Sequence, residues 1–167
     1  MLTAPHGRRE AEEFYGWTPL LYQSEAGTAA AAWERDKIIS VPLPAAMRYA
    51  GQPVRSIRVH HKLAGVFHDV YAEIFRAALW HCVESYAGAY EFRLIRGGAS
   101  LSMHAFGAAV DHDPERNPLG SHPNDCYFGS TPEGAAVVRI FRKWGFTWGG
   151  TFKGRKDCQH FQFSSGC

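Results

Sequence analysis

The sequence has 167 residues, of which 46% are hydrophobic and 14% aromatic, and these values exclude a disordered chain. The length indicates one globular domain that buries a sizeable core. The net charge of +2 gives no electrostatic support for a nucleic-acid partner. No apolar run reaches the roughly 18 residues of a membrane span, and residues 1–13 lack the apolar centre of a signal peptide. We therefore expect a chain that is made in the cytoplasm and does not act in a membrane.

The cysteines and histidines indicate which kind of metal site to look for. Nine histidines are many for a chain of this length. The four cysteines show no C-x-x-C pairing, which argues against a thiolate zinc site and favours a reduced compartment, with one disulfide left open. Four histidines in and before the first long apolar pattern are interpreted as ordinary surface or boundary residues: His60, His61, His68 and His81.

The N-terminal third shows little regular pattern. The first 30 residues carry aromatic anchors but are expected to be loosely organised, and residues 1–50 are treated as an extension packed on a domain of residues 51–167. Residues 37–43 predict a strand at a sheet edge, because the prolines that bound it lack a backbone donor. Residues 54–59 predict a second short strand.

Two helices and two further strands follow along the chain. Apolar residues at spacings of three and four predict a helix over residues 62–86. A second helix is predicted from Ser130-Thr131-Pro132-Glu133, where a hydroxyl cap and an early proline are start signals, to a stop at Gly145. Residues 146–148 and 160–163 predict strands. This order favours an α+β fold, a single domain with a small antiparallel sheet flanked by helices, over repeated βαβ units.

Two short segments carry candidate metal ligands. His104 and Asp111 lie seven residues apart, and Gly107 between them lets the chain bend from a loop into a strand. His160 opens a later strand, and Asp157 precedes it by three residues. A catalytic zinc needs three protein ligands, an open position for water and a nearby carboxylate base. These four side chains supply such a set, so the sequence predicts a zinc site.

The same segments carry a family resemblance. Residues 102–111, SMHAFGAAVD, match the S-x-H-x-x-G-x-A-x-D signature of the D-Ala-D-Ala carboxypeptidase/L-Ala-D-Glu endopeptidase family of zinc peptidases. Residues 157–160, DCQH, match that family's [DE]-x-x-H motif. Residues 90–98 resemble the segment that precedes the signature, and the resemblance covers roughly residues 54–163. It implies the sheet-and-helix fold that these peptidases share with hedgehog-type domains.

The resemblance also implies a role for each matching residue. It implies that His104, Asp111 and His160 bind zinc, and that Asp157 is the general base. Arg93 matches the arginine that stabilises the oxyanion, with Arg96 as the competing choice. Ser102 is expected to position the loop or a group of the substrate, which makes it and Arg96 candidate substrate-binding residues.

The resemblance implies a zinc-dependent peptidase that hydrolyses the stem peptide of bacterial peptidoglycan. The small size, the missing signal peptide and the D-x-x-H form favour an endolysin-like monomer that cuts between L-Ala and D-Glu and reaches the cell wall after release. Two alternatives stay open. One is a D-Ala-D-Ala carboxypeptidase, and the other is a non-catalytic, zinc-stabilised module of the cell wall or of a phage structure.

Overall fold

The computed structural model describes residues 2–17, 28–95 and 97–166. Within these residues, no helix is both long and apolar enough to span a membrane. The helices and strands, in chain order, are α1 (Gly7–Tyr15), α3 (Thr28–Lys37), β1 (Ile38–Tyr49), β2 (Gln52–His60), α4 (Ala64–Arg76), β3 (Tyr86–Gly88), β4 (Ala109–His112), α5 (Tyr127–Ser130), α6 (Pro132–Lys143), β5 (Thr147–Trp148) and β6 (His160–Gln162).

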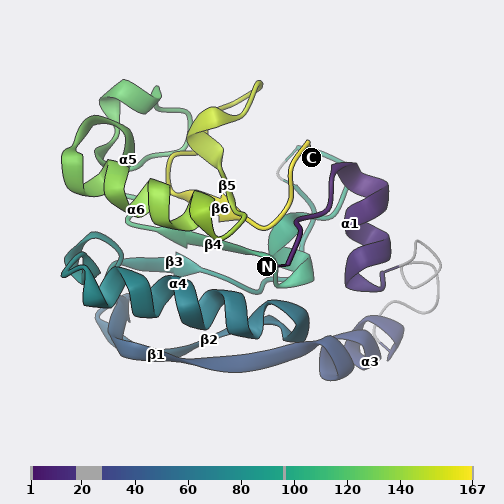
Figure 1. Cartoon of the computed structure of the whole chain (residues 1–167). Coiled ribbons are helices and arrows are strands. Elements are labelled where there is room, and N and C mark those ends of the chain that lie inside the picture. The colour runs from purple at the N-terminus through teal and green to yellow at the C-terminus, as the bar shows by residue number, and fades with distance from the viewer. Residues whose placement is uncertain (1, 18–27, 96, 167) are drawn as a thin grey trace.

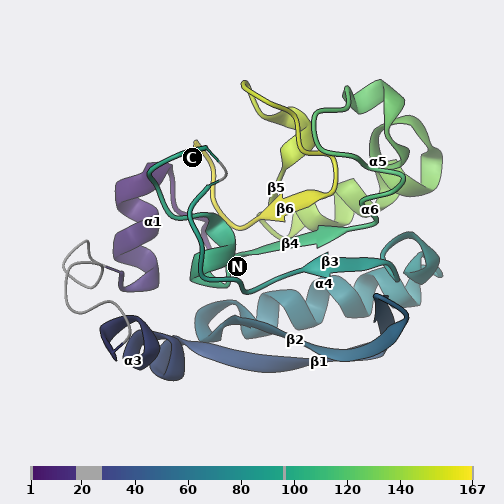
Figure 2. The same ribbon diagram turned by 180° about the vertical axis from the view of Figure 1, so that it is seen from behind.

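The strands form two antiparallel sheets. β1 and β2 pair as a long hairpin that packs along α4, and β3, β4, β6 and β5 form a four-stranded sheet in that order. Figure 1 shows α4 and α6 over one face of the four-stranded sheet, and Figure 2 shows the sheet from its other side. The α+β prediction, with a small antiparallel sheet flanked by helices, is confirmed.

Alternation along β4 and β6 separates the core face of the sheet from its open face. Successive side chains of a strand point to opposite faces. Phe161 stacks on Phe141 of α6, with ring centroids 4.1 Å apart, and His112 bonds to Tyr71 of α4. The residues between them in the alternation, such as Asp111, therefore point away from the helices. The helix-covered face belongs to the core, and the other face is free for a site.

The helix predicted over residues 62–86 is shorter than predicted. α4 ends at Arg76, and Ala78 adopts a left-handed backbone with φ of 58° that turns the chain. A short 3-10 helix and β3 follow in place of the expected helical turns. Cys82 and Val83 are nevertheless fully buried, because the chain folds back so that they still contact the core. The apolar spacing therefore persisted beyond the end of the helix, and this made the prediction too long.

The second predicted helix is confirmed as α6. Thr131 is its N-cap, and the Thr131 hydroxyl accepts a hydrogen bond of 3.0 Å from the backbone N–H of Gly134. Pro132 is the first helical residue. Trp144 caps the C-terminal end, and Gly145 follows with φ of 94°, a conformation that favours glycine.

The N-terminal segment is more ordered than expected. α1 forms, and Tyr15 at its end stacks on Phe106 with ring centroids 5.6 Å apart. Trp33 of α3 donates a hydrogen bond of 3.2 Å to the Tyr15 carbonyl oxygen. His60, predicted to be a surface or boundary residue, is fully buried beside Tyr15 and Trp33. That prediction was wrong because Tyr15 and Trp33, which are distant in the sequence, cover His60. Residues 18–27 lie outside the described part of the chain.

Candidate metal centre

Strand register brings two of the predicted ligands together. Asp111 of β4 and His160 of β6 are direct partners across the antiparallel pair. Side chains at such positions lie on one face with their Cβ atoms about 5 Å apart. The Asp111 Oδ1 atom lies 2.8 Å from His160 Nδ1. The two residues are 49 positions apart in sequence, and only the pairing of β4 with β6 makes them neighbours.

A tight turn delivers His104 to the same face. Ser102 caps a 3-10 helix, Met103–Phe106, and its hydroxyl accepts a hydrogen bond of 3.3 Å from the His104 backbone N–H. Gly107 then turns the chain into β4 with φ of 63°. A Cβ atom on Gly107 would lie 2.6 Å from the backbone nitrogen of His60, so no side chain fits there. The bend expected at Gly107 is present.

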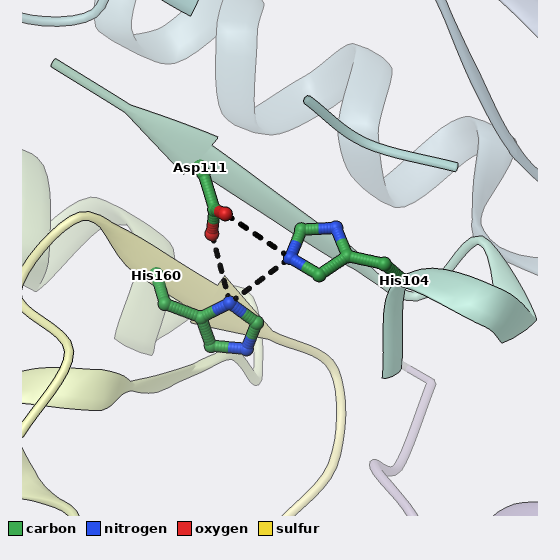
Figure 3. A group of neighbouring side chains, drawn as sticks. All are labelled: His104, Asp111 and His160. Carbon is green, nitrogen blue, oxygen red and sulfur yellow. Dashed lines mark hydrogen bonds and ion pairs between the residues drawn. The ribbon is translucent and has the colours of Figure 1, made fainter. Parts of the chain in front are cut away.

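The three side chains form one compact cluster on the open face of the sheet (Figure 3). Their candidate ligand atoms all lie within 4.8 Å of one another, and His104 Nε2 lies 3.3 Å from Asp111 Oδ2. His104 Nδ1 lies 2.6 Å from the Ala89 carbonyl oxygen, and His160 Nε2 lies 3.0 Å from Gln162 Oε1. Each histidine therefore has an outer acceptor for one ring N–H, and its other ring nitrogen faces the cluster, where it can bind a cation once it has lost its proton. Two imidazole nitrogens and one carboxylate make a donor set that fits zinc.

Asp111 and His160 each have a pKa that is shifted in favour of the charged form. Burial alone raises the pKa of Asp111, but hydrogen bonds and charge from His104 and His160 outweigh it and hold that pKa well below 3.8. Burial likewise lowers the pKa of His160, but the Asp111 carboxylate outweighs it and the net shift is upward. Asp111 is thus ionised at neutral pH, and protons compete with a cation for His160.

Asp157 lies in the same cleft and is held by its backbone. Its N–H donates to the Gly149 carbonyl at 3.1 Å, and its carbonyl accepts from the His160 N–H at 3.1 Å. The Asp157 Oδ1 atom is buried and has no hydrogen-bond partner among the described residues. Burial is the first cause that raises the pKa of this carboxyl above its usual value. A buried, unpaired carboxylate oxygen with a raised pKa is suited to accept a proton.

The remaining predicted site residues are Arg93, Arg96 and Ser102. Arg93 lines the cleft, and its Nε atom donates to Glu91 Oε2 at 2.7 Å. Arg96 lies outside the described residues. Ser102 lines the cleft and is buried, and its hydroxyl is used to cap the His104 turn.

Two polar neighbours of the cluster, His112 and Asp113, have other partners. His112 points to the core face, where its Nε2 atom lies 2.9 Å from the Tyr71 hydroxyl. Asp113 forms an ion pair with Arg116. Among the described residues, His104, Asp111 and His160 are the group of three or more His, Cys, Asp or Glu side chains close enough to hold one ion.

The cleft around the cluster has a volume of about 880 Å³ and draws on more of the chain than the two motifs. Arg8 from α1 and two cations after β5, Lys153 and Arg155, also line it. Sequence reasoning missed these residues. The signal was weak, because single basic residues in a polar N-terminus or a Gly- and Lys-rich loop match no motif.

Residues 96–163 match the model of a family described as D-alanyl-D-alanine carboxypeptidase. The matched segment contains the whole His–Asp–His cluster and Asp157. The comparison with curated proteins gave no match, and neither did the comparison with solved structures. The match covers less than half of the chain, and together with the cluster it supports a resemblance to metal-dependent peptidases over this segment. More particularly, the match agrees with the resemblance of this segment to the D-Ala-D-Ala carboxypeptidase family.

Proposed function

We propose that the chain is a zinc-dependent, endolysin-like peptidase that hydrolyses the stem peptide of bacterial peptidoglycan between L-Ala and D-Glu. One observation carries the proposal. Three ligand atoms within 4.8 Å of one another share a cleft with a buried carboxylate oxygen that has no partner among the described residues. A structural zinc site would use a fourth protein ligand, whereas three ligands and a free carboxylate suit catalysis. The family match over the same residues supports hydrolysis of a peptide.

In this proposal His104, Asp111 and His160 hold the metal, and Asp157 moves the proton. Bound zinc would supply Lewis acidity and lower the pKa of a water molecule. Asp157 Oδ1 takes the proton from the attacking water and returns it to the leaving amine. The raised pKa of Asp157 makes this carboxylate a stronger base than an exposed one.

Arg93 is proposed to stabilise the oxyanion of the tetrahedral intermediate. Its guanidinium lines the cleft and is anchored by Glu91, which leaves other N–H groups to donate. Arg96 stays the alternative for this role. Ser102 is proposed to act through the turn that it caps, because its hydroxyl fixes the backbone of His104.

The first test is zymography on peptidoglycan with the zinc-loaded protein. Asp157→Ala should reduce clearing by about 10²- to 10⁴-fold, the usual contribution of a general base. Asp69→Ala is the matched control, because Asp69 is an exposed carboxylate on α4 that bonds to His68. An Asp157→Ala protein that clears cell walls like the wild type contradicts the proposed base. Wild-type protein that never clears them favours the non-catalytic alternative.

Metal analysis tests the ligand set separately. His160→Ala should lose stoichiometric zinc, since one of three donors is removed. His68→Ala should keep it, because His68 is an exposed histidine outside the cluster. A fully loaded His160→Ala protein refutes the ligand set.

The scissile bond needs its own experiment, because two candidates have support. The D-x-x-H motif at residues 157–160 favours the bond between L-Ala and D-Glu, whereas the description of the matched family favours removal of a terminal D-Ala. Mass spectrometry of digested peptidoglycan distinguishes them by the newly exposed termini. A new D-Glu amino terminus supports the proposal, and released D-Ala supports the carboxypeptidase.

Light scattering at working concentration tests the monomer that we propose as the active form.

A further inference from the structure

The N-terminal segment forms one wall of the cleft. His6 pairs with Ser165 in a parallel bridge, and the Gly7 N–H donates to the Ser165 carbonyl at 2.7 Å. The Ser165 N–H donates in turn to the Pro5 carbonyl at 3.0 Å. Ser165 follows closely after β6, so these bonds fix the start of α1 beside the strand that carries His160 (Figures 1 and 2). The first turn of α1 is therefore held at the site.

Arg8 in that first turn has a guanidinium without a matching anion. It lines the same cleft as His104 and Asp157. Its Cζ atom lies 5.9 Å from the centre of the Phe106 ring, which supports the side chain from one side. Its Nη1 atom is buried without a hydrogen-bond partner, and no described carboxylate lies within ion-pair distance of Arg8. Arg8 as a whole is only half-buried at the cleft wall, so its other N–H groups can take an acceptor from a ligand.

The balance of charge in the cleft points to the kind of ligand. The described cations that line it are Arg8, Arg93, Lys153 and Arg155. The described carboxylates that line it are Asp111 and Asp157, and the proposed function uses both. Glu91 pairs with Arg93 from outside the cleft. The other three cations still outnumber the two carboxylates, so an anionic group of a substrate would meet an excess of positive charge.

We propose that Arg8 binds a free carboxylate of the substrate peptide and so determines specificity. This inference rests on the proposed function, since it assigns Arg8 to the substrate of that site. Arginine presents planar N–H groups that match a carboxylate, and the half-buried Arg8 guanidinium lines the cleft without a carboxylate partner among the described residues. A stem peptide offers this chemistry at its C-terminus and at the α-carboxylate of a γ-linked D-Glu. Arg8 lies outside the family match of residues 96–163, so it would adapt this chain's own cleft.

The experiment measures peptide binding by calorimetry with zinc-loaded protein in the Asp157→Asn background, where hydrolysis is expected to be slow. The probes are the peptide L-Ala-γ-D-Glu-L-Lys-D-Ala-D-Ala, its C-terminal amide and its D-Glu α-amide. The variants are Arg8→Gln and Arg8→Lys. Arg9→Gln is the matched control, because Arg9 is the next residue of the same helix, is exposed and does not line the cleft.

Arg8→Gln should weaken binding of the free peptide about 10- to 100-fold, the usual effect of losing a charge-assisted hydrogen bond. Arg9→Gln should change it less than about twofold, and Arg8→Lys should restore part of the affinity. Amidation of the carboxylate that Arg8 contacts should weaken binding to the protein with native Arg8. The loss should be about as large as the loss that Arg8→Gln causes for the unmodified peptide. That amide should lose no further affinity in Arg8→Gln, and it identifies which carboxylate Arg8 contacts.

Three results would overturn the assignment of Arg8. The first is unchanged affinity in Arg8→Gln, and the second is an equal loss for the free peptide and both amides, which indicates a structural role. The third is no loss from either amidation in the Arg8-containing protein, a comparison that does not depend on how well a variant folds. Protein with native Asp157 that binds the peptide without cutting it contradicts the proposed function, whereas the binding data still decide the role of Arg8.

Discussion

His60 makes the stability of the fold sensitive to acid. The imidazole is fully buried, its Nδ1 atom accepts a hydrogen bond of 3.2 Å from the Lys62 N–H, and its Nε2 atom lies 3.2 Å from the Tyr15 carbonyl oxygen. A neutral ring with its hydrogen on Nε2 satisfies both contacts, whereas a second proton would remove the acceptor at Nδ1. Burial first, and then the charges of His61, Lys62 and Lys37, lower the pKa of His60 from 6.5 to about 4.

The direction and size of the effect follow from linkage. The unfolded chain takes up this proton near pH 6.5 and the folded chain only near pH 4, so stability is present above pH 6.5 and is lost as the pH falls toward 4. At about 1.36 kcal/mol per pKa unit, the complete loss is about 3 kcal/mol, and about 2 kcal/mol of it appears between pH 7 and pH 5. Burial also lowers the pKa of His112 to about 4, which adds a similar loss to the wild type and to variants at His60 and His68 and therefore cancels from their comparison.

The assay is urea unfolding at pH 7 and pH 5 of the wild type, His60→Gln and the exposed-site control His68→Gln. Glutamine offers one donor and one acceptor but does not titrate. We expect the unfolding free energy of the wild type and of His68→Gln to fall by about 2 kcal/mol more than that of His60→Gln. His60 is outside the metal cluster, so proton competition for the metal affects all three proteins alike and cancels from the comparison. An equal fall in wild type and His60→Gln would refute this reasoning.

Three further substitutions test the turns and contacts that position the site. Gly107→Ala should lower the unfolding free energy by at least about 2 kcal/mol and reduce bound zinc. The reason is that φ at this position is 63° and that a Cβ atom would lie 2.6 Å from the His60 backbone nitrogen. Unchanged melting and metal content would contradict this. Tyr15→Phe should cost about 1 to 3 kcal/mol in thermal unfolding, because the Phe163 carbonyl loses a 2.7 Å hydrogen bond, and a neutral result would mean that this carbonyl finds another donor. Thr131→Ala should cost about 1 kcal/mol in the same assay through the lost N-cap of α6, which an unchanged melting curve would exclude.

The sequence predicted α6 and the strands that carry the candidate ligands better than it predicted α4 or α1. Thr131, Pro132 and Gly145 are local signals that act within a few residues, so the bounds of α6 could be predicted from them. The end of α4 at Arg76 depends on a left-handed turn at Ala78, a residue type with no preference for that conformation. α1 consists largely of charged residues, and its contacts come from residues distant in the sequence.

The residues of the candidate site also differ in whether local sequence signals could predict them. His104, Gly107 and Asp111 form one motif and could be found by spacing, and Asp157 with His160 forms a second. Spacing could not identify Arg8 as a site residue. Its position at the cleft depends on hydrogen bonds between residues 5–7 and Ser165, which lie at opposite ends of the sequence. Burial of His60 was missed for the related reason that its cover comes from a distant segment.

Because Asp111 pairs directly with His160, a metal ion bound at the candidate site would also favour the correct register of β4 and β6. If β6 slipped by one residue along β4, His160 would turn toward the helices and Phe161 would enter the polar cleft. Such a slipped sheet would lack two adjacent donors and would bind the ion poorly, so the ion would stabilise the correct alignment by its own binding free energy. Refolding with the metal should therefore favour the native alignment over shifted ones, and chelation should remove that preference.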